Sequence, residues 1–367
     1  MAHEETPLRV GLIGLGAVAE AHLASTARAV GARVVAGADL DPARRTTIAP
    51  RWAIRGYADV GEMLDREQLD IACVLTPALT HRAMALEAAR RGVHVLCEKP
   101  LAATLEDARA IVADCAAHGV RLAYGSTYRF LPAVRAAKDL VVDGRLGELC
   151  LLTEGFVGGA GPEAWRDLGP HHYPSGGPGG GGMGLIDHGV HLVDVFRWLT
   201  ASEVTAVVGR GNVSGGRPAT EFLTMLFASG AVGQLVYNEA TFGSDLPSEG
   251  TFSWGGRWAP DGRVLPGGGW DPHPLSIRVH GSCAALRLFP YANQLFLFEG
   301  GGVTQVPLDG PPMPGNFTLQ LESFAARIRR DEEPEVTGAD GVRALEVVFA
   351  AYRSFAERRF VVPDRDS

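Results

Sequence analysis

With 46% hydrophobic and 21% charged residues, a chain of 367 residues is typical of a globular protein with two or three domains. The formal net charge of −8 and the lack of a basic tail argue against nucleic acid and against an anionic membrane as partners. The polar N-terminus has no apolar signal core, no apolar run is long enough to cross a bilayer, and the five cysteines are scattered without metal-ligand spacing, so we expect a cytoplasmic protein with reduced thiols and no metal.

The first predicted element is an apolar strand at residues 8–13, which runs into a glycine-rich turn and an alanine-rich helix. The turn has the sequence GLGAVA and fits the G-x-G-x-x-G/A pattern of dinucleotide-binding proteins. Glycines permit close approach of a pyrophosphate, which then lies at the amino end of the helix. Gly14, Gly16, Ala17 and Val18 are therefore candidate cofactor-binding residues. In the alternative, the turn merely joins a strand to a helix.

A second strand, at residues 33–38, ends at Asp39. In dinucleotide-binding folds a carboxylate at this place accepts hydrogen bonds from the adenosine ribose and repels a 2′-phosphate, so Asp39 favours NAD over NADP. Arg44 and Arg45 follow closely and can tolerate a phosphate, which keeps NADP open. In the alternative, Asp39 only caps the helix that begins near Pro42.

Further strands alternate with helices after this point. Strands are predicted at 70–75, 93–97 and 120–123, with helices at 80–91 and 104–118 between them. This alternation predicts a parallel, doubly wound sheet. Thr76 and Pro77 follow the first of these strands and are candidate cofactor contacts. His81 lies at a helix start facing the strand ends, where contact with the cofactor and plain helix capping are both open.

The strand at 93–97 is followed at once by Glu98, Lys99 and Pro100. Ligands of open α/β sheets bind at the carboxyl ends of the strands. A lysine at this place can hold a substrate oxygen, and the proline fixes how the chain leaves the strand. Glu98 and Lys99 are therefore candidate cofactor-binding residues, and Lys99 is also a candidate catalytic and substrate-binding residue.

After Gly125 the pattern changes to a helix at 130–142, longer strands joined by glycine-rich turns, and a final amphipathic helix at 341–358. The strands are predicted at 148–156, 203–210, 221–228, 233–241, 276–280, 284–289 and 294–299. Their loose alternation indicates a mainly antiparallel sheet. The fold class is thus α/β, with a Rossmann dinucleotide-binding domain at 1–126 and an α+β domain at 127–367.

Two long stretches, 158–184 and 243–274, predict no regular secondary structure, which is typical of functional or disordered loops. Trp165, Arg166 and His171 in the first stretch are candidate substrate-binding residues. The alternative is a mobile surface insertion.

The first stretch leads into a predicted helix that carries an acid–base motif. Asp187 and His191 are four residues apart and share one helix face, with Asp194 a turn further, whereas His188 points elsewhere. A carboxylate beside an imidazole orients or tunes a proton-transfer group, which alcohol oxidation or ketone reduction requires. Asp187 and His191 are therefore candidate catalytic and substrate-binding residues; the alternative is a purely structural spacing.

Together these segments resemble the Gfo/Idh/MocA family of oxidoreductases. The matching stretches are VGLIGLG at 10–16, TPALTH at 76–81, CEKPLA at 97–102, DHGVHLVD at 187–194 and the tail at 336–354. The resemblance implies that Lys99 holds the substrate oxygen, that His191 is the general acid/base and that Asp187 completes the catalytic set. It also implies a cis peptide bond before Pro100 and an open C-terminal sheet whose free face makes homodimers or homotetramers.

One position departs from the inositol dehydrogenases of that family. Such proteins often have consecutive arginines before the first helix of the second domain, where this chain has the sequence GSTYRF. Tyr128 stands where a substrate-binding arginine would be and is a further substrate-binding candidate. Together with the loop at 158–184, this departure indicates a larger or looser substrate site.

The sequence therefore predicts an NAD-dependent oxidoreductase that transfers a hydride between nicotinamide and a secondary hydroxyl or keto carbon. The expected substrate is a sugar, a cyclitol or a sugar-containing natural product. Two alternatives use the same fold. One is a nucleotide-binding regulator, and the other is an NAD-dependent glycoside hydrolase in which the hydride leaves and returns.

Overall fold

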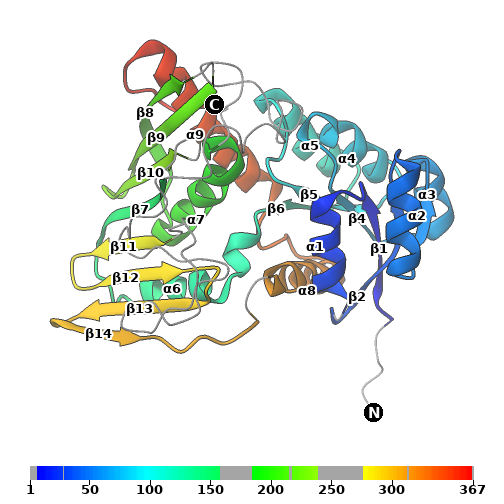
Figure 1. Cartoon of the computed structure of the whole chain (residues 1–367), viewed down its shortest axis with the longest axis horizontal. Coiled ribbons are helices and arrows are strands. Elements are labelled where there is room, and N and C mark those ends of the chain that lie inside the picture. The colour runs from blue at the N-terminus through cyan, green and yellow to red at the C-terminus, as the bar shows by residue number, and fades with distance from the viewer. Residues whose placement is uncertain are drawn as a thin grey trace. The chain divides into compact units, whose positions relative to one another are not determined.

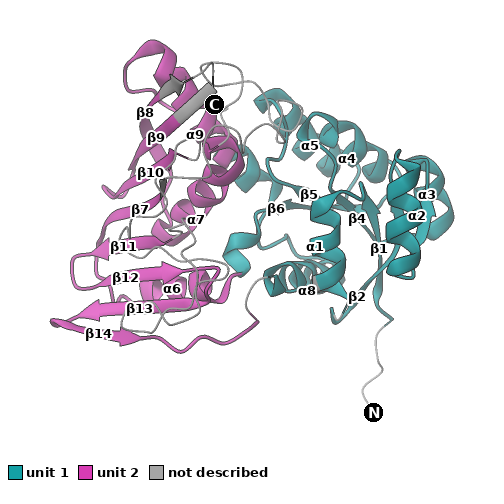
Figure 2. Ribbon diagram, viewed as in Figure 1, with its two compact units in different colours: residues 1–130, 313–343 teal, residues 131–312, 344–367 magenta. Residues whose placement is uncertain are grey.

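The computed structural model describes residues 6–27, 29–157, 184–214, 217–238, 276–311 and 314–365. Contacts divide the chain into two compact units, which Figure 2 distinguishes by colour. Unit 1 comprises residues 1–130 and 313–343, and unit 2 comprises residues 131–312 and 344–367. Each unit is a group of contacting residues and combines two separate stretches of the chain. The predicted domains are instead two continuous stretches that divide after residue 126, and that division stays a prediction.

Unit 1 contains a six-stranded parallel sheet in the order β3-β2-β1-β4-β5-β6 (Figure 1). The strands are β1 (Leu8–Ile13), β2 (Ala32–Ala38), β3 (Arg55–Tyr57), β4 (Ile71–Val74), β5 (His94–Glu98) and β6 (Leu122–Gly125). Because β1 lies between β2 and β4, the strand order reverses there. The carboxyl ends of the strands beside such a reversal are where doubly wound folds bind nucleotides.

Helices cover both faces of this sheet. They are α1 (Ala17–Thr26), α2 (Pro42–Arg51), α3 (Val60–Glu67), α4 (His81–Ala89), α5 (Leu105–Ala117) and α8 (Gly315–Arg329), with short 3₁₀ turns η1 (Ala78–Thr80) and η2 (Thr127–Phe130). One core joins Leu12 of β1 and Leu23 of α1 to Leu321 and Phe324 of α8. On the other face Gly11 of β1 packs against α3. Hydrophobic burial on both faces accounts for the nearly continuous apolar runs of the strands.

Unit 2 contains an eight-stranded sheet in the order β14-β13-β12-β11-β7-β10-β9-β8 (Figure 1). The strands are β7 (Leu149–Val157), β8 (Val204–Ser214), β9 (Arg217–Phe227), β10 (Val232–Asn238), β11 (Ile277–Gly281), β12 (Ala285–Phe289), β13 (Gln294–Glu299) and β14 (Gly302–Gln305). β7 and β10 are parallel, and the other neighbouring pairs are antiparallel. The predicted fold class, a Rossmann domain with a mainly antiparallel second sheet, is confirmed.

One face of this second sheet is buried beneath helices. The helical elements of the unit are α6 (Pro132–Val142), a π-helical turn η4 (Gly184–Gly189), α7 (Val190–Thr200) and the part of α9 (Gly338–Glu357) from Ala344 onward. The row of paired residues Met225, Leu152, Val279, Leu286 and Leu297 is buried throughout. Gly233 lies in the same row and contacts Phe196 of α7 closely, so this row faces the helices.

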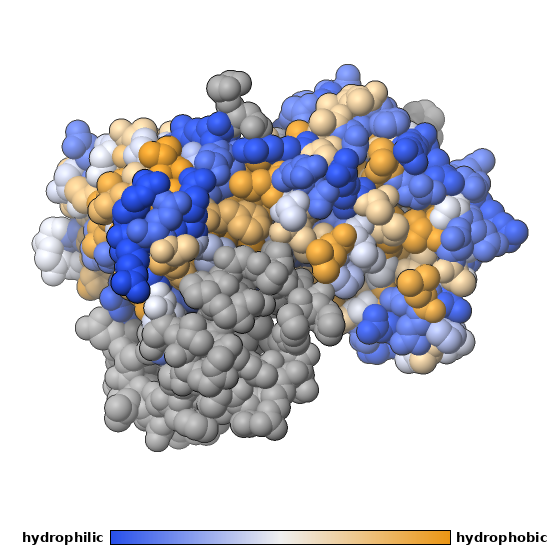
Figure 3. Space-filling model, turned by 90° about the horizontal axis from the view of Figure 1, so that it is seen from above, coloured by the Kyte–Doolittle hydropathy of each residue, from blue (hydrophilic) through white to orange (hydrophobic). Residues whose placement is uncertain are grey.

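The neighbouring row faces the other way and includes exposed apolar side chains. Leu226, Val232, Leu151, His280, Ala285 and Phe298 are paired in turn across six strands. Leu226 is 36% exposed and Phe298 38%. Figure 3 shows one face of the molecule, on which hydrophilic and hydrophobic residues are interspersed over the part that is coloured. Across the described part of the chain, none of the helices combines the length and apolar character that a membrane crossing requires.

Candidate functional site

The glycine-rich turn joins β1 to α1 at the carboxyl edge of the unit 1 sheet. Gly14 has a φ of +100°, and a Cβ there would lie 3.0 Å from the carbonyl oxygen of Leu75, so glycine is required. Gly16 is the N-cap residue of α1, and exposed Ala17 and half-buried Val18 open the helix. This turn of small residues before the N–H groups of a helix fits a dinucleotide pyrophosphate.

Asp39 lies directly after β2, beside the same turn. Its Oδ2 accepts a hydrogen bond from the N–H of Leu15 at 2.8 Å, and its Oδ1 accepts one from the N–H of Asp41. The N-cap residue of α2 is Asp41, whose side chain accepts from Ala43, so helix capping is not the role of Asp39. Its carboxylate therefore lies at the glycine-rich turn, where the ribose of a dinucleotide would approach.

The two arginines after Asp39 have different partners. Arg44 Nη1 lies 3.5 Å from Asp39 Oδ2, and the Arg44 side chain is half exposed. Arg45 Nη1 instead donates to the carbonyl oxygens of Asp39 and Leu40. Of the two candidates for holding a 2′-phosphate, Arg45 is thus bound to backbone, and Arg44 is paired with a carboxylate.

His81 is the first residue of α4, and its side chain is buried. Its Nε2 lies 2.6 Å from the carbonyl oxygen of Thr76, and its Nδ1 lies 3.2 Å from that of Leu101. Burial lowers the pKa of His81, although these carbonyls act in the opposite direction. The imidazole links the segment after β4, which contains Thr76 and Pro77, to the segment after β5, and the N-cap residue of α4 is Thr80 rather than His81. Contact of His81 with a cofactor stays a prediction.

Glu98, the last residue of β5, is buried and held on both oxygens. Its Oε1 lies 3.0 Å from His22 Nε2, and its Oε2 accepts from the N–H of Lys99 at 3.0 Å. Burial alone would raise the pKa of Glu98, but the bond to His22 and the charge of Lys99 outweigh it, so the pKa is lowered. The peptide bond between Lys99 and Pro100 is cis, as the family resemblance implies. Glu98 therefore fixes the backbone that presents Lys99.

His22 is a residue that the sequence prediction missed. It lies on α1, its side chain is 3% exposed, and its ring packs edge-on against Phe317 of α8 at 4.7 Å. A histidine among the apolar residues of the helix after a glycine-rich turn was the available signal, because a buried imidazole needs a hydrogen-bonding partner.

Tyr128 lies in η2 and is 5% exposed. The adjacent Arg129 is also buried, and its guanidinium pairs with Asp340 at 3.0 Å. This ion pair gives the buried Arg129 a structural role within unit 1. The three loop candidates, Trp165, Arg166 and His171, lie outside the described residues.

The acid–base motif adopts a different helix geometry from the one predicted. Residues 184–189 form the π turn η4, whose hydrogen bonds span five residues, and α7 starts only at Val190. A Cβ on Gly184 would lie 2.4 Å from the Cβ of Tyr237, so glycine is required where the turn meets β10. Asp187 is half-buried, and His191 and Asp194 are buried.

The prediction that His188 points away from His191 is wrong. The two ring centroids lie 6.4 Å apart, and the His188 ring also packs edge-on against Tyr237 at 5.4 Å. His188 Nε2 lies 3.1 Å from Glu154 Oε1 on β7. The physical reason is the spacing, since residues three apart are neighbours on a helical surface just as residues four apart are.

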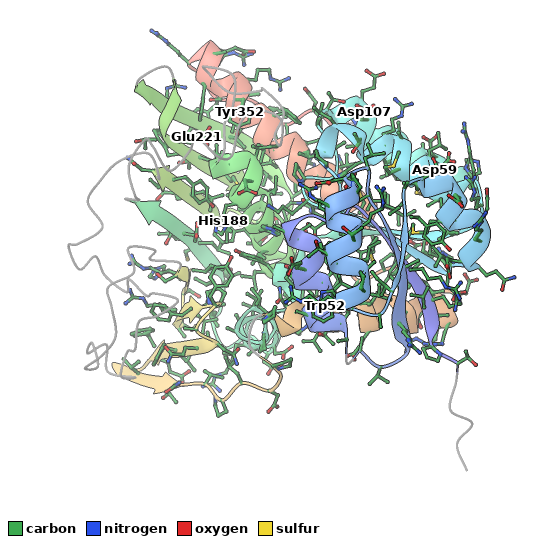
Figure 4. All side chains as sticks on the ribbon, turned by 45° about the vertical axis from the view of Figure 1, so that its right-hand side comes forward. Trp52, Asp59, Asp107, His188, Glu221 and Tyr352 are labelled. Atoms are coloured by element: carbon green, nitrogen blue, oxygen red, sulfur yellow. The ribbon has the colours of Figure 1, made fainter. Side chains whose placement is uncertain are left out.

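A second carboxylate, that of Glu221, forms a hydrogen bond with the backbone of η4. Glu221 of β9 accepts a hydrogen bond at 3.0 Å from the N–H of Leu185. Burial raises the pKa of Glu221 to about 7, although the N–H groups of Leu185 and Gly184 oppose the shift. Figure 4 labels Glu221, His188 and Tyr352, which come from β9, η4 and α9. Tyr352 is fully buried, and its pKa is raised by burial and by the charge of Glu221.

Two family models match this chain. One, described as an oxidoreductase family with an NAD-binding Rossmann fold, matches residues 8–126, and the other, described as its C-terminal alpha/beta domain, matches residues 138–363. The chain therefore belongs to the Gfo/Idh/MocA oxidoreductase family, and its N-terminal part is an NAD-binding Rossmann fold. The predicted family and the predicted NAD-binding Rossmann fold are confirmed.

Individual relatives match along most of their length. D-apiose dehydrogenase of Paraburkholderia graminis is 28% identical over 368 residues, covering 95% of this chain and 88% of that protein. The scyllo-inositol 2-dehydrogenase (NAD(+)) of Bacillus subtilis is 27% identical, covering 96% and 95%. Among solved structures, aldose-aldose oxidoreductase from Caulobacter crescentus complexed with glycerol has a TM-score of 0.78 at 25% identity, covering 97% of this chain and all of that one.

Proposed function

We propose that this oxidoreductase is an NAD-dependent dehydrogenase or reductase acting on a secondary CH–OH or C=O of a sugar, a cyclitol or a sugar-containing natural product. The relatives named above act, by their names, on a pentose and on a cyclitol. The observation that carries the proposal is the place of Lys99. Lys99 follows β5 at the carboxyl edge of the sheet, and the glycine-rich turn lies at the same edge. A nucleotide bound at the turn would therefore lie at the same edge of the sheet as the lysine.

Lysine is rare in this chain. The chain has 34 basic residues, of which only Lys99 and Lys138 are lysine. Lysine provides a compact ammonium on a flexible stem, whereas arginine provides a planar fork, and the two are not interchangeable where one oxygen must be held. Lys138 donates to the carbonyl oxygen of Trp198, which is a structural contact. Of the two lysines, Lys99 is the one that follows a strand at the carboxyl edge of the unit 1 sheet, and we propose it for the chemical role.

In the proposed reaction Lys99 donates to the substrate oxygen and stabilises the charge that develops on it. His191 takes the hydroxyl proton in the oxidation and returns it in the reduction. Asp187 orients Lys99 and His191 or tunes their protonation. When bound, NAD supplies the hydride acceptor or donor at its nicotinamide. Gly14, Gly16 and the first turn of α1 hold its pyrophosphate.

We propose NAD rather than NADP as the cofactor in use. Asp39 carries a negative charge at the ribose position, and Arg45 is bound to backbone carbonyls. A 2′-phosphate would meet the carboxylate, and of the two arginines after Asp39, Arg44 alone has its guanidinium off the backbone carbonyls to offset the repulsion.

We also propose that the chain forms homodimers or homotetramers through the free face of the unit 2 sheet. The row from Leu226 to Phe298 exposes an apolar side chain at each of its two ends. Burial of such a row against a second copy removes apolar surface from water.

The test is an absorbance screen for NADH formation with cyclitols, aldoses, sugar nucleotides and aminoglycosides, with NAD⁺ and then NADP⁺. Lys99→Ala and His191→Ala are expected to lose turnover while keeping NADH affinity by fluorescence. Lys138→Ala is the matched control and should retain turnover. Reduction that survives in both site variants, or loss of NADH binding in both, would contradict these roles. NADH binding without turnover in either direction would favour the regulator, and sugar release without net NADH change would favour the hydrolase.

A further inference from the structure

His188 forms a second histidine–carboxylate pair beside the acid–base motif. Its Nε2 lies 3.1 Å from Glu154 Oε1, and its ring packs against both His191 and Tyr237. Neither His188 nor Glu154 has a role in the reaction proposed above.

The partner carboxylate is deeply buried. The Glu154 side chain is 1% exposed, and its Oε2 accepts no hydrogen bond from the described residues. A buried carboxylate needs a donor or a positive charge nearby, because its transfer from water is otherwise costly. Since a carboxylate only accepts, His188 carries hydrogen on Nε2. His188 is therefore the group that Glu154 orients.

The ring of His188 is fixed by packing as well as by this bond. Tyr237 lies edge-on at 5.4 Å and an interplanar angle of 85°, and His191 at 6.4 Å and 67°. The side chain of His188 is 17% exposed, so the ring lies between a buried carboxylate and the surface. A charge on this ring would be felt at His191 with limited screening by water.

We propose that His188 and Glu154 are a positioning pair that sets the protonation of His191 during catalysis. His188 holds the orientation of the His191 ring by contact, and the charges of the pair act on its proton in opposite directions. Glu154 favours a proton on His191, and a protonated His188 disfavours it. The inference depends on the proposed function only for the role of His191 as general acid/base.

Other titratable groups adjoin the same segment. Asp187 and Asp194 lie on the segment itself, Glu221 comes from β9, and Tyr352 comes from α9. Because these groups remain in place in the variants below, a change in pH dependence reports on the pair alone.

The test is the pH–rate profile for substrate oxidation in which His191 must be deprotonated. Glu154→Gln removes the negative charge, so the acid limb should move to lower pH. His188→Gln removes the ionisable ring and leaves the carboxylate, so the limb should move to higher pH. For His188, a unit charge at the 6.4 Å ring separation predicts a displacement of roughly 0.5 to 2 pH units, depending on the effective dielectric. The double variant should lie between the single variants.

Matched controls are available at exposed positions. Glu148→Gln changes an exposed carboxylate before β7, and in unit 1 His118→Gln changes an exposed histidine after α5, and both should leave the limb in place. NADH affinity and near-ultraviolet circular dichroism check the fold of each variant. Should His188→Gln lose NADH binding, Glu154→Gln carries the test alone, because a glutamine keeps the shape and an acceptor oxygen.

Limbs that stay in place, or that move in the same direction in both variants, would overturn the inference. The two levels of proposal fail in different ways. If His191→Gln keeps normal turnover, the proposed role of His191 is wrong. If His191→Gln is inactive while the profiles of the Glu154 and His188 variants match the wild type, only the positioning pair is wrong.

Discussion

His22 Nε2 and Glu98 Oε1 lie 3.0 Å apart, and both side chains are buried within unit 1. His22 belongs to α1, the helix that follows the glycine-rich turn, and Glu98 ends β5 and accepts from the N–H of Lys99. The contact therefore connects the nucleotide-binding helix to the strand end that presents the lysine. The position of Lys99 depends on a histidine in a distant part of the sequence.

We expect His22→Leu to lower both stability and turnover. Without the imidazole, one oxygen of the buried Glu98 carboxylate loses its partner, which costs about 1–3 kcal/mol of unfolding free energy. The backbone of Lys99 also loses its support, so kcat should fall more than NADH affinity. Urea unfolding and steady-state kinetics measure these quantities. His118→Leu, at an exposed site after α5, should stay within about 0.5 kcal/mol of the wild type. A stability equal to that control would show that the His22 contact is dispensable.

Glu221 predicts a pH dependence of stability. Its pKa is raised from 4.5 to about 7 by burial, so between these values the folded state binds more protons than the unfolded state. The contribution of Glu221 to unfolding free energy is thus greatest below pH 4.5 and falls as pH rises through 7, by about 3 kcal/mol. Glu221→Gln should remove this slope, and Glu148→Gln should not. Parallel stability curves for wild type and Glu221→Gln between pH 5 and 8 in urea titrations would refute the assignment.

Asp39 should control the choice between the two nucleotides. Asp39→Ala removes the charge-assisted hydrogen bonds that we propose between this carboxylate and the ribose, so NADH affinity should fall about 10- to 150-fold. NADPH affinity should fall less or rise, because repulsion of the 2′-phosphate is removed as well. Fluorescence titration with both nucleotides measures the ratio. Asp65→Asn, on α3, is the control and should leave the ratio unchanged. Equal losses for NADH and NADPH would show that Asp39 does not discriminate.

The two lysines allow a substitution that keeps charge. Lys99→Arg should reduce kcat on the order of 100-fold, because the larger planar guanidinium cannot occupy the position of the ammonium at the substrate oxygen. Lys138→Arg should retain kcat within about threefold, since its contact is with a backbone carbonyl. Turnover is measured at saturating substrate. Full activity in Lys99→Arg would assign Lys99 a purely electrostatic role.

The exposed apolar row of the unit 2 sheet predicts where the oligomer interface lies. Leu226→Arg combined with Phe298→Asp should convert the proposed dimer or tetramer to a monomer, because charges replace apolar side chains on one face. Light scattering after size-exclusion chromatography gives the mass. Val142→Arg, an exposed apolar position at the end of α6, serves as control. A double variant with the wild-type mass would exclude this face as the interface.

Local pattern predicted most of the fold. The strand at 8–13, the glycine-rich turn and Asp39 form one unit of sequence, and β1 agrees with the predicted range residue for residue. β14 and α8 are absent from the prediction, although Phe317, Leu321 and Phe324 have helical spacing. The place of α8 against α1 depends on contacts between residues about 300 positions apart, which no local pattern encodes.

The candidate site was predicted in parts. Lys99 and Asp39 follow from strand ends, because in doubly wound sheets the place of a residue after a strand decides its role. The π turn did not follow, since a motif of four-residue spacing looks the same in an α-helix. His188 was misplaced because its spacing of three residues from His191, which also brings side chains together on a helix, was not considered. His22 was missed because its partner, Glu98, comes from another strand.

The return of residues 313–343 to unit 1 has a consequence for synthesis of the protein. Leu321, Phe324 and Ala325 complete the core against α1 and β1. When only residues 1–130 have left the ribosome, the nucleotide-binding sheet therefore has one face partly uncovered. That face stays exposed until almost the whole of unit 2 has been translated, so a nascent chain needs protection from aggregation for most of its elongation.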